Sequence, residues 1–166
     1  MFREMRRKKQ AIDETACLEI LKKEKRGVLC MTADGWPYGI PMDHVLLDGK
    51  LYFHCAKAGK KLEALREDGR VCYTVTGEGQ RGEGWPLHFG SVLVFGRMRE
   101  IRDSEMIWKV CRALTAKFTD EPEYAEKEWA VSGTKLSCLE ITPEHITGKK
   151  SRSGKRNGEI SRRGEK

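Results

Sequence analysis

Residues 51–62 read Leu-Tyr-Phe-His-Cys-Ala-Lys-Ala-Gly-Lys-Lys-Leu, and the rest of the chain is organised around this stretch. Its first half alternates between two faces, which predicts a β-strand. Cys55 falls on the face of the apolar residues, so we interpret it as a core residue, and His54 falls on the opposite face. The second half contains leucines at helical spacing, which predicts a helix that begins near Gly59.

The junction between this strand and this helix combines two features that attract anions. A helix N-terminus offers unpaired backbone N–H groups and the positive end of a dipole, and Lys57, Lys60 and Lys61 add positive charge. The junction is therefore a candidate phosphate site. The alternative is an ordinary turn with solvated lysines. Lys61 is the strongest single candidate, because a lysine in a first helical turn is unfavourable unless an anion is present.

The charge of the chain is concentrated at its two ends. The 166 residues suit one domain and carry a net charge of +7, of which residues 1–10 contribute +4 and residues 148–166 contribute +6. The part between them therefore has a net charge of −3. We expect a basic N-terminal lead over residues 1–10, one folded domain over residues 11–148, and a basic, disordered tail over residues 149–166.

The basic tail has two interpretations. Its eight lysines and arginines could bind DNA or RNA without sequence preference. However, it has no aromatic residue on which a base could stack, and the body is negatively charged. We therefore favour a solvated extension and regard a nucleic-acid partner as disfavoured.

The six cysteines form no C-x-x-C pair and mostly lie inside apolar runs. This pattern indicates reduced, buried thiols and predicts neither a disulfide framework nor a metal site. No apolar run approaches the length of a membrane helix, and the basic N-terminus lacks the apolar region of a signal peptide. We expect a cytoplasmic protein with no membrane partner.

The remaining pattern predicts a mainly β fold with packed helices. Asp13 and Asp103 are candidate N-caps of two helices, and Gly27 is the predicted end of the first. Asp-Gly pairs at residues 34–35 and 48–49 predict tight hairpins, and residues 77–86, rich in glycine, predict a loop. We count about four helices and six strands, which are predicted at residues 28–31, 36–47, 51–55, 71–76, 88–101 and 136–141. The short apolar run at residues 28–31 predicts a strand covered on both faces. Hairpin-joined strands favour an antiparallel barrel or sheet over a doubly wound parallel sheet.

The strand predicted at residues 36–47 is irregular. Pro37 and Pro41 cannot donate hydrogen bonds to a neighbouring strand, and Gly39 has no side chain to pack. Such a strand is typical of a sheet edge, a bulge, or a place where a ligand approaches the backbone. Asp43 and His44 then interrupt its apolar pattern.

Motifs of independent hydrolytic or nucleotide-binding chemistry are missing from the sequence. It contains no G-x-G-x-x-G, P-loop or G-x-S-x-G motif. Nor does it show a Ser-His-Asp, Cys-His or paired-carboxylate pattern.

The order of these features resembles the FMN-binding split barrels related to pyridoxamine 5′-phosphate oxidase, and is most similar to the branch of the nitroimidazole-resistance proteins. The resemblance covers roughly residues 10–150. The segments that carry it are GVL (27–29), GWPYGIP (35–41), DGKLYFHCA (48–56), GKKL (59–62), VCYTV (71–75), SVLVFG (91–96) and ITGK (146–149).

The resemblance implies a six-stranded antiparallel split β-barrel that forms a homodimer with FMN at the subunit interface. It implies that the isoalloxazine ring lies along the irregular strand and that the strand-to-helix junction holds the phosphate. A histidine is common in the family at position 60, where this chain has a lysine that keeps the charge but loses the imidazole. The implied cofactor-binding residues are Pro41, Met42, Asp43, His44, His54, Ala56, Gly59, Lys60, Lys61, Ser91 and Val92.

The function implied by this resemblance is that of an FMN-binding oxidoreductase acting on a small molecule, such as a nitroaromatic compound. His54 is a candidate catalytic residue. Two alternatives stay open: a flavin-binding module without turnover, and a haem-binding split barrel in which His44 or His54 is the axial ligand. The lysine-rich junction suits a phosphate better than it suits haem.

Overall fold

The computed structural model describes residues 2–81 and 87–151 of the chain. Helices occur in four places, at α1 (Glu14–Lys23), α2 (Lys60–Glu67), α3 (Ser104–Thr115) and α4 (Tyr124–Ser132). Two short 3-10 helices are η1 (Lys8–Gln10) and η2 (Gly133–Lys135). The strands are β1 (Ala11–Ile12), β2 (Arg26–Ala33), β3 (Trp36–Asp43), β4 (Val45–Leu47), β5 (Lys50–Ala56), β6 (Arg70–Thr76), β7 (Gln80–Arg81), β8 (Leu87–His88), β9 (Gly90–Ile101) and β10 (Leu136–Lys150).

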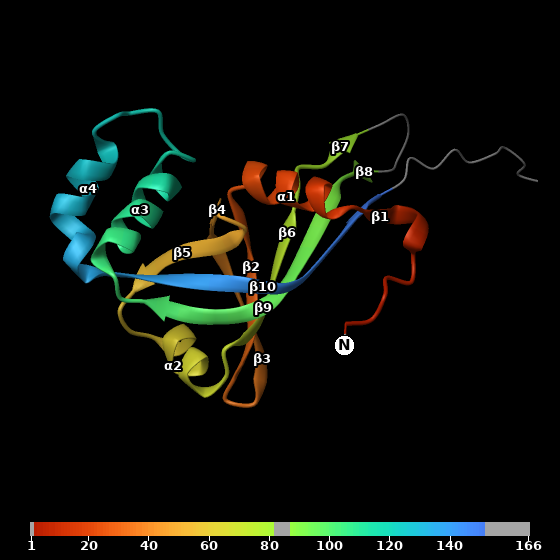
Figure 1. Cartoon of the computed structure of the whole chain (residues 1–166), viewed down its shortest axis with the longest axis horizontal. Helices are drawn as coiled ribbons and strands as arrows, with labels where there is room; N and C mark the ends of the chain where they lie inside the picture. The colour runs from red at the N-terminus through yellow and green to blue at the C-terminus, as the bar shows by residue number, and fades with distance from the viewer. Residues whose placement is uncertain (1, 82–86, 152–166) are drawn as a thin grey trace, which may run out of the picture.

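One antiparallel sheet dominates the molecule, with the strand order β3-β2-β6-β9-β10-β5-β4 and with β1 added to the end of β10 (Figure 1). Its six long strands confirm the predicted six-stranded antiparallel split barrel with packed helices. Strands β7 and β8 form a separate small hairpin. Part of the loop predicted at residues 77–86 is therefore strand, and residues 82–86 lie outside the described part of the chain.

A bend in the chain joins the two edges of the open barrel. Strands β3 and β4 are consecutive in sequence, yet they lie at opposite edges of the strand order. The single strand predicted at residues 36–47 is therefore wrong: it is two strands, and His44 lies at the corner between them. The prediction of an edge is confirmed, because β3 pairs only with β2, as its prolines require.

Two tight turns confirm the predicted hairpins. Asp34 and Gly35 have φ angles of 52° and 75°, and Asp48 and Gly49 have φ angles of 49° and 75°. Left-handed conformation at both central residues is the type I′ turn that the right-handed twist of paired strands favours. These turns set the register of β2 with β3 and of β4 with β5.

The two predicted aspartate caps are confirmed. The Asp13 carboxylate accepts a hydrogen bond from the Ala16 backbone N–H at 2.8 Å, and Asp103 accepts one from Met106 at 2.7 Å. Gly27 does not end the first helix, which stops at Lys23. It lies within β2, where a Cβ atom would come within 2.4 Å of the Thr74 carbonyl oxygen. A glycine is needed here because β2 and β6 approach each other too closely for a side chain.

The final strand is longer than its apolar pattern indicated. β10 continues past a register shift between Pro143 and His145 and pairs with β9 as far as Lys150, and the Ser151 hydroxyl donates to the carbonyls of Leu87 and Phe89. The predicted boundary at residue 148 is therefore too early, because backbone pairing extends beyond the last apolar side chain. Residues 152–166 lie outside the described part.

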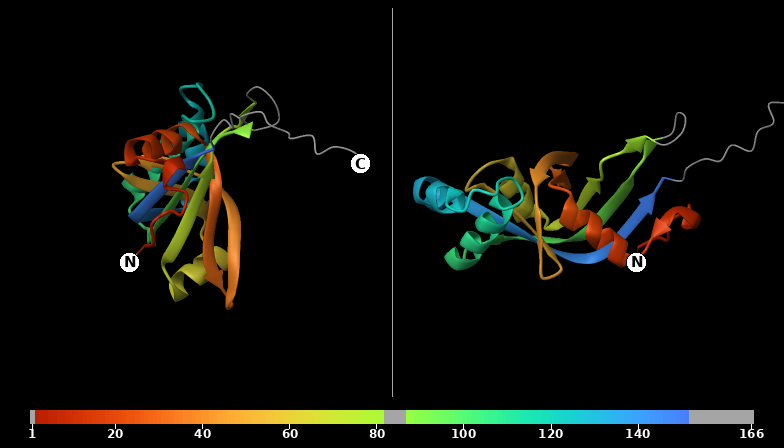
Figure 2. Two further views of the ribbon diagram at one scale, coloured as in Figure 1. Left: turned by 90° about the vertical axis from the view of Figure 1, so that its right-hand side faces the viewer. Right: turned by 90° about the horizontal axis from the view of Figure 1, so that it is seen from above.

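The molecule has two apolar cores. One fills the barrel and contains Leu29, Phe53 and Tyr73; the other lies between α3 and the outer face of the sheet, around Tyr52 and Cys138. Figure 2 shows α3 and α4 gathered at one end of the sheet. The prediction that residues 28–31 are covered on both faces is wrong within one chain: Leu29 and Met31 are buried, whereas Val28 and Cys30, on the other face, are half-buried.

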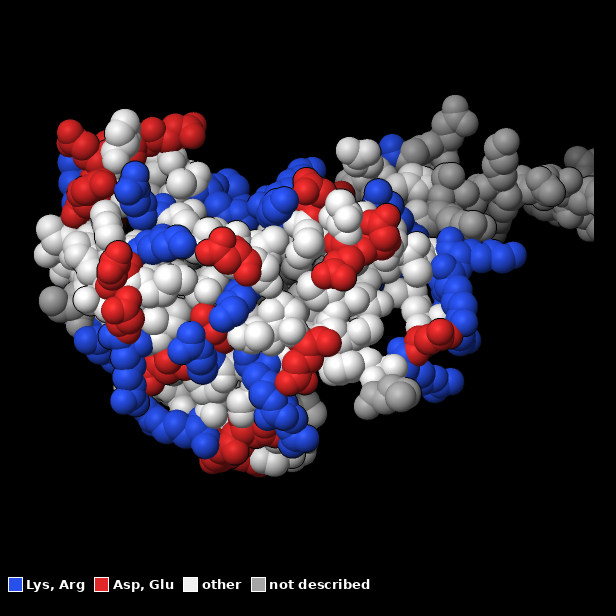
Figure 3. All heavy atoms as spheres, in the orientation of Figure 1, with Lys and Arg blue, Asp and Glu red and all other residues white. Residues whose placement is uncertain are grey.

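Charged side chains of both signs are mixed over the face seen in Figure 3. Four acidic residues in and just before α4, Glu121, Glu123, Glu126 and Glu128, are exposed. None of the helices in the described segments is both long enough and apolar enough to cross a membrane.

Candidate functional site

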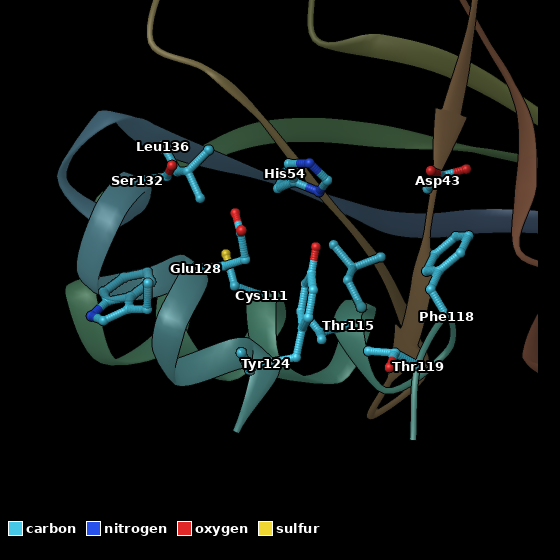
Figure 4. Close-up of a pocket in the computed structure, with 13 residues that line it drawn as sticks. Asp43, His54, Cys111, Thr115, Phe118, Thr119, Tyr124, Glu128, Ser132 and Leu136 are labelled. Atoms are coloured by element: carbon cyan, nitrogen blue, oxygen red, sulfur yellow. The ribbon is translucent and has the colours of Figure 1, made fainter. Parts of the chain in front are cut away.

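A cavity of about 510 Å³ lies between the outer face of β5, helices α3 and α4, and the end of β3. Figure 4 shows its lining side chains. They come from segments far apart in sequence, and they are Asp43, His54, Cys111, Leu114, Thr115, Phe118, Thr119, Tyr124, Ala125, Glu128, Trp129, Ser132 and Leu136.

His54 reaches this cavity because of the alternation of β5. Tyr52, two residues earlier on the same face, is covered by α3 and buried at 4 % exposure. His54 lies just past this cover, opposite Cys138 of β10, and its side chain is exposed. Its ring makes no hydrogen bond to any described residue. The predicted candidate catalytic residue is thus an uncommitted imidazole that faces a cavity.

Helix α4 contributes two polar groups that the sequence reasoning missed. Tyr124 and Glu128 are four residues apart, so they share one face of the helix, and both line the cavity. Figure 4 shows the Tyr124 hydroxyl and the Glu128 carboxylate on the side of the cavity that His54 faces. Their spacing was the available signal, but the sequence did not show that α4 packs against α3 at the cavity that His54 faces.

Asp43 lines the cavity, and its negative charge is paired with the guanidinium of Arg26. It is the cross-strand partner of Arg26, whose guanidinium donates to both carboxylate oxygens, at 2.6 and 2.9 Å. Interaction with Asp43 raises the pKa of Arg26 above its ordinary value. Asp43 and His54, both predicted from sequence, are therefore the two predicted cofactor residues that this cavity unites.

His44 is a buried structural residue. It has no exposed surface, its Nε2 donates to the Leu21 carbonyl at 2.8 Å, and its Nδ1 lies 2.9 Å from the Tyr73 hydroxyl. Burial and, secondarily, the positive charge of Lys117 lower the pKa of His44 from 6.5 to about 4. Both ring nitrogens are engaged, so the alternative in which His44 is the axial ligand of haem is wrong for this arrangement. The flavin contact that the resemblance implies is with the backbone of this strand, and it stays a prediction.

The backbone polar groups around this corner also form hydrogen bonds within the protein. The His44 N–H donates to the Lys25 carbonyl at 3.0 Å, and the Lys117 ammonium donates to the carbonyls of Glu24 and His44. The Met42 carbonyl accepts from Tyr73, and the Met42 side chain is buried in the barrel. Pro41 is exposed on β3. Of these three residues, only Pro41 presents surface to a ligand.

The junction between β5 and α2 has the features of an anion site. Gly59 is the N-cap of α2, with a φ of 123° and no side chain to satisfy the helix. Within the described part of the chain, the backbone N–H groups of Lys60 and Lys61 have no acceptor. Ala56, at the end of β5, is exposed beside them.

The two lysines of this junction differ. Lys60 forms an ion pair with Asp34 at 2.7 Å and lies over the Tyr38 ring at 5.6 Å. Lys61 is half-buried, and no carboxylate of the described segments lies within ion-pair distance of it. Lys61 therefore keeps its charge available for a ligand, while Lys60 is held toward the β2–β3 turn. Neither lysine lines the cavity around His54.

The structure does not bring Ser91 and Val92 to this site. Both are buried at the start of β9, whereas the strand end nearest His54 is Ile101, the partner of Cys138. Ten residues of strand correspond to about 33 Å. Because β9 spans the whole barrel, one chain does not bring these residues to His54, and their place beside a cofactor at the subunit interface stays a prediction.

Trp129 lines the cavity, and its ring also packs against Trp108 at 5.2 Å. Trp36, at the start of β3, is 75 % exposed. Trp85 lies outside the described residues.

Comparison with known proteins places the chain in a family. The sequence profile of the family described as Pyridoxamine 5′-phosphate oxidase matches residues 13–150. No curated protein sequence matches the chain significantly.

Solved structures have the same fold. A proposed 5-nitroimidazole antibiotic resistance protein from Bacteroides thetaiotaomicron superposes with a TM-score of 0.72 and 20% identity, over 84% of this chain and 86% of that one. The flavocytochrome Anf3 from Azotobacter vinelandii gives 0.74 and 20%, over 91% and 73%. An FAD-binding protein from Mesorhizobium loti gives 0.66 and 23%, over 86% and 98%.

Proposed function

Because this chain belongs to the pyridoxamine 5′-phosphate oxidase family, we propose that it is a flavoprotein that binds FMN. The phosphate would bind at the β5–α2 junction, and the flavin ring would lie beside Asp43 and His54. The observation that carries the proposal is the junction itself. An uncapped helix N-terminus and an unpaired, half-buried Lys61 follow directly on the strand that carries His54.

The residues present fit the two ends of FMN. Two free backbone N–H groups and the Lys61 ammonium suit a phosphate dianion. The other end offers a cavity with apolar walls, from Leu114, Phe118 and Trp129, and few polar groups, as is typical of cofactor sites. FAD-binding proteins among the structural neighbours support a flavin as the ligand class. The choice of FMN is the finer part of the proposal.

We propose that the activity is reduction of a small electrophilic molecule such as a nitroaromatic compound. A bound flavin supplies the electrons for such a reaction. His54 is positioned to donate a proton to the reduced substrate, and the Tyr124 hydroxyl faces the same space. The walls contributed by α3 and α4 would limit the access of water. The structural neighbour from Bacteroides thetaiotaomicron supports the choice of nitro compounds.

We propose that the active form is a homodimer. The outer face of the sheet carries half-buried apolar side chains, among them Val28, Leu93 and Phe95, and Phe2 is 44 % exposed beside them. A second copy related by two-fold symmetry is the commonest cover for such a face. It would also offer a route by which Ser91 could approach a cofactor. A solution mass near that of one 19.0 kDa chain, measured by light scattering with FMN bound, would contradict the dimer.

Titration with FMN, riboflavin and FAD tests the cofactor proposal. We expect FMN to bind more tightly than riboflavin, because riboflavin lacks the phosphate that the junction would hold. Equal affinities would exclude the junction as the phosphate site. If FAD binds more tightly than FMN, the family-level assignment stands and the choice of cofactor changes.

Haem binding is the second candidate function. It is supported by one observation: the His54 imidazole faces a cavity and has no hydrogen-bond partner among the described residues. His54 would have to be the axial ligand, since His44 is committed to the core. Visible absorption separates the two candidates. Flavin gives absorption bands at about 370 and 450 nm, whereas haem bound through its iron gives a Soret band.

A further inference from the structure

Cys30 of β2 and Cys72 of β6 are direct cross-strand partners in the sheet. Both thiols are free and both side chains are half-buried. Because directly opposed residues of an antiparallel pair point to the same face, the two thiols share the outer face of the sheet. The expectation of uniformly buried thiols is thus wrong for this pair, while Cys17, Cys55 and Cys138 are buried as expected.

The backbone geometry of this pair suits a disulfide bond. Directly opposed residues of antiparallel strands have Cα atoms about 4.5 or 5.5 Å apart, depending on the type of pair. Both values lie inside the range of about 4.4–6.8 Å found in disulfides. The pair is also the last of the three that join β2 to β6, so a bond here would fasten the strands where their ladder ends.

The Cys30 thiol is left uncovered on one side by Gly39, its partner on β3. A Cβ atom at Gly39 would lie 3.9 Å from the Cys30 Sγ and 3.5 Å from Val28. This is ordinary contact, so a side chain would fit there and cover the sulfur. In one chain taken alone, the absence of that side chain gives a small reagent access to Cys30 along the exposed edge strand. The proposed homodimer would cover this face, since Cys72 is the cross-strand partner of Phe95, so the exchange proposed below is a reaction of the dissociated chain.

We propose that Cys30 and Cys72 form a reversible disulfide by exchange with a small disulfide such as oxidised glutathione. One protein thiolate attacks the small disulfide, forming a mixed disulfide and releasing one glutathione thiolate. The second protein thiolate then attacks the protein sulfur of that mixed disulfide and releases the second glutathione. Two protein thiols lose two electrons and two protons, and one glutathione disulfide becomes two thiols.

The bond would enclose the segment that carries the proposed flavin site. Asp43, His54 and the junction at Gly59 all lie between the two cysteines in sequence. A cross-link between residues 30 and 72 restricts the unfolded chain over this whole segment. We therefore expect the oxidised protein to melt several degrees higher than the reduced protein.

Peptide mapping of the full chain after incubation with oxidised glutathione tests the proposal. Free thiols are blocked with iodoacetamide, and the protein is digested with trypsin without reduction. Every cysteine lies in a separate tryptic peptide, so the expected product is residues 27–50 joined to residues 71–81. Its mass is the sum of the two peptides less two hydrogen atoms, and dithiothreitol separates them.

Three variants sharpen the test. Cys72→Ser should abolish the linked peptide, and Cys111→Ser, which changes a half-buried thiol of the cavity wall, should leave it unchanged. Gly39→Val should slow the formation of the bond several-fold, because it covers the Cys30 sulfur. The proposal is overturned if the native protein gives no linked peptide, if the linkage joins Cys111 to Cys138 instead, or if Gly39→Val reacts as fast as the unchanged chain.

Discussion

Two histidines ten residues apart occupy opposite environments in this protein. His44 lies at the corner between β3 and β4, fully buried, with both ring nitrogens engaged by Leu21 and Tyr73. His54 lies on β5, exposed to a cavity and without a described hydrogen-bond partner. Sequence reasoning assigned both to the cofactor.

The difference teaches how to separate structural from functional polar residues. The Tyr73 hydroxyl approaches both the Met42 carbonyl and His44, so the corner uses nearly all its polar groups internally. Lys117 completes it by donating to two carbonyls. A polar group whose hydrogen bonds are all made to other residues of the protein stabilises the fold, whereas a polar group without such partners can bind or react with a ligand.

The largest effect is expected from His44→Ala, which should lower the free energy of unfolding by about 4 kcal/mol. The change opens a cavity in the core and leaves the Leu21 carbonyl without its donor. Urea denaturation measures the effect. His54→Ala is the matched control and should change stability by less than about 0.5 kcal/mol. Equal destabilisation by the two changes would refute the distinction between them.

The pH dependence of stability tests the same corner. The pKa of His44 is about 4 in the fold and about 6.5 in the unfolded chain, so the unfolded state binds the proton more readily. His44 therefore gives full stability above pH 6.5, and this contribution is lost as the pH falls toward 4. The loss is about 3 kcal/mol, measurable by denaturation at pH 7 and pH 4.5. In His44→Phe this part of the pH dependence should disappear; if it persists, another group is responsible.

Reduction of a nitroaromatic compound by the flavin-loaded protein should become about 100-fold slower in His54→Ala. This is the lower range for loss of a general acid. Stopped-flow reoxidation of the reduced flavin by the nitroaromatic compound measures it. A rate in His54→Ala equal to that of the unchanged chain would exclude His54 as the proton donor.

Lys61→Ala should weaken FMN binding by about 2 kcal/mol, the scale of a charged hydrogen bond. Lys60→Ala is the matched control, because Lys60 is already paired with Asp34, and its effect should be smaller. Riboflavin binding should respond to neither change. Fluorescence titration gives the affinity of each protein for FMN and for riboflavin. An equal loss of FMN affinity in both lysine variants would contradict the different roles assigned to Lys60 and Lys61.

The smallest effect is expected from truncation after Ser151. Ser151 is the last described residue that bonds to the sheet, and the segment beyond it contains a single large apolar residue, Ile160. FMN affinity and melting temperature should be unchanged, while any nucleic-acid binding of the full chain should vanish. Lost FMN binding on truncation would mean that the tail contributes to the site.

Local patterns in the sequence determined much of the fold. Asp13 and Asp103 cap helices, and the Asp-Gly pairs form type I′ turns, because these features depend on a few neighbouring residues. The strand-to-helix junction at Gly59 follows from a change of periodicity that is visible in the chain alone. Its anion-binding character also follows locally, since a helix N-terminus is polar wherever it lies.

Only the tertiary structure decided which of the candidate residues named from the sequence share one site. The corner at His44 exists because β3 and β4 lie at opposite edges of one sheet, and the cavity exists because α4 packs against α3, beside the part of β5 that α3 leaves uncovered. Pairing over long sequence separation extended β10 to Lys150 and placed Cys30 opposite Cys72. Such contacts depend on which distant strands pair and which helix covers them, so no local pattern distinguishes His44 from His54.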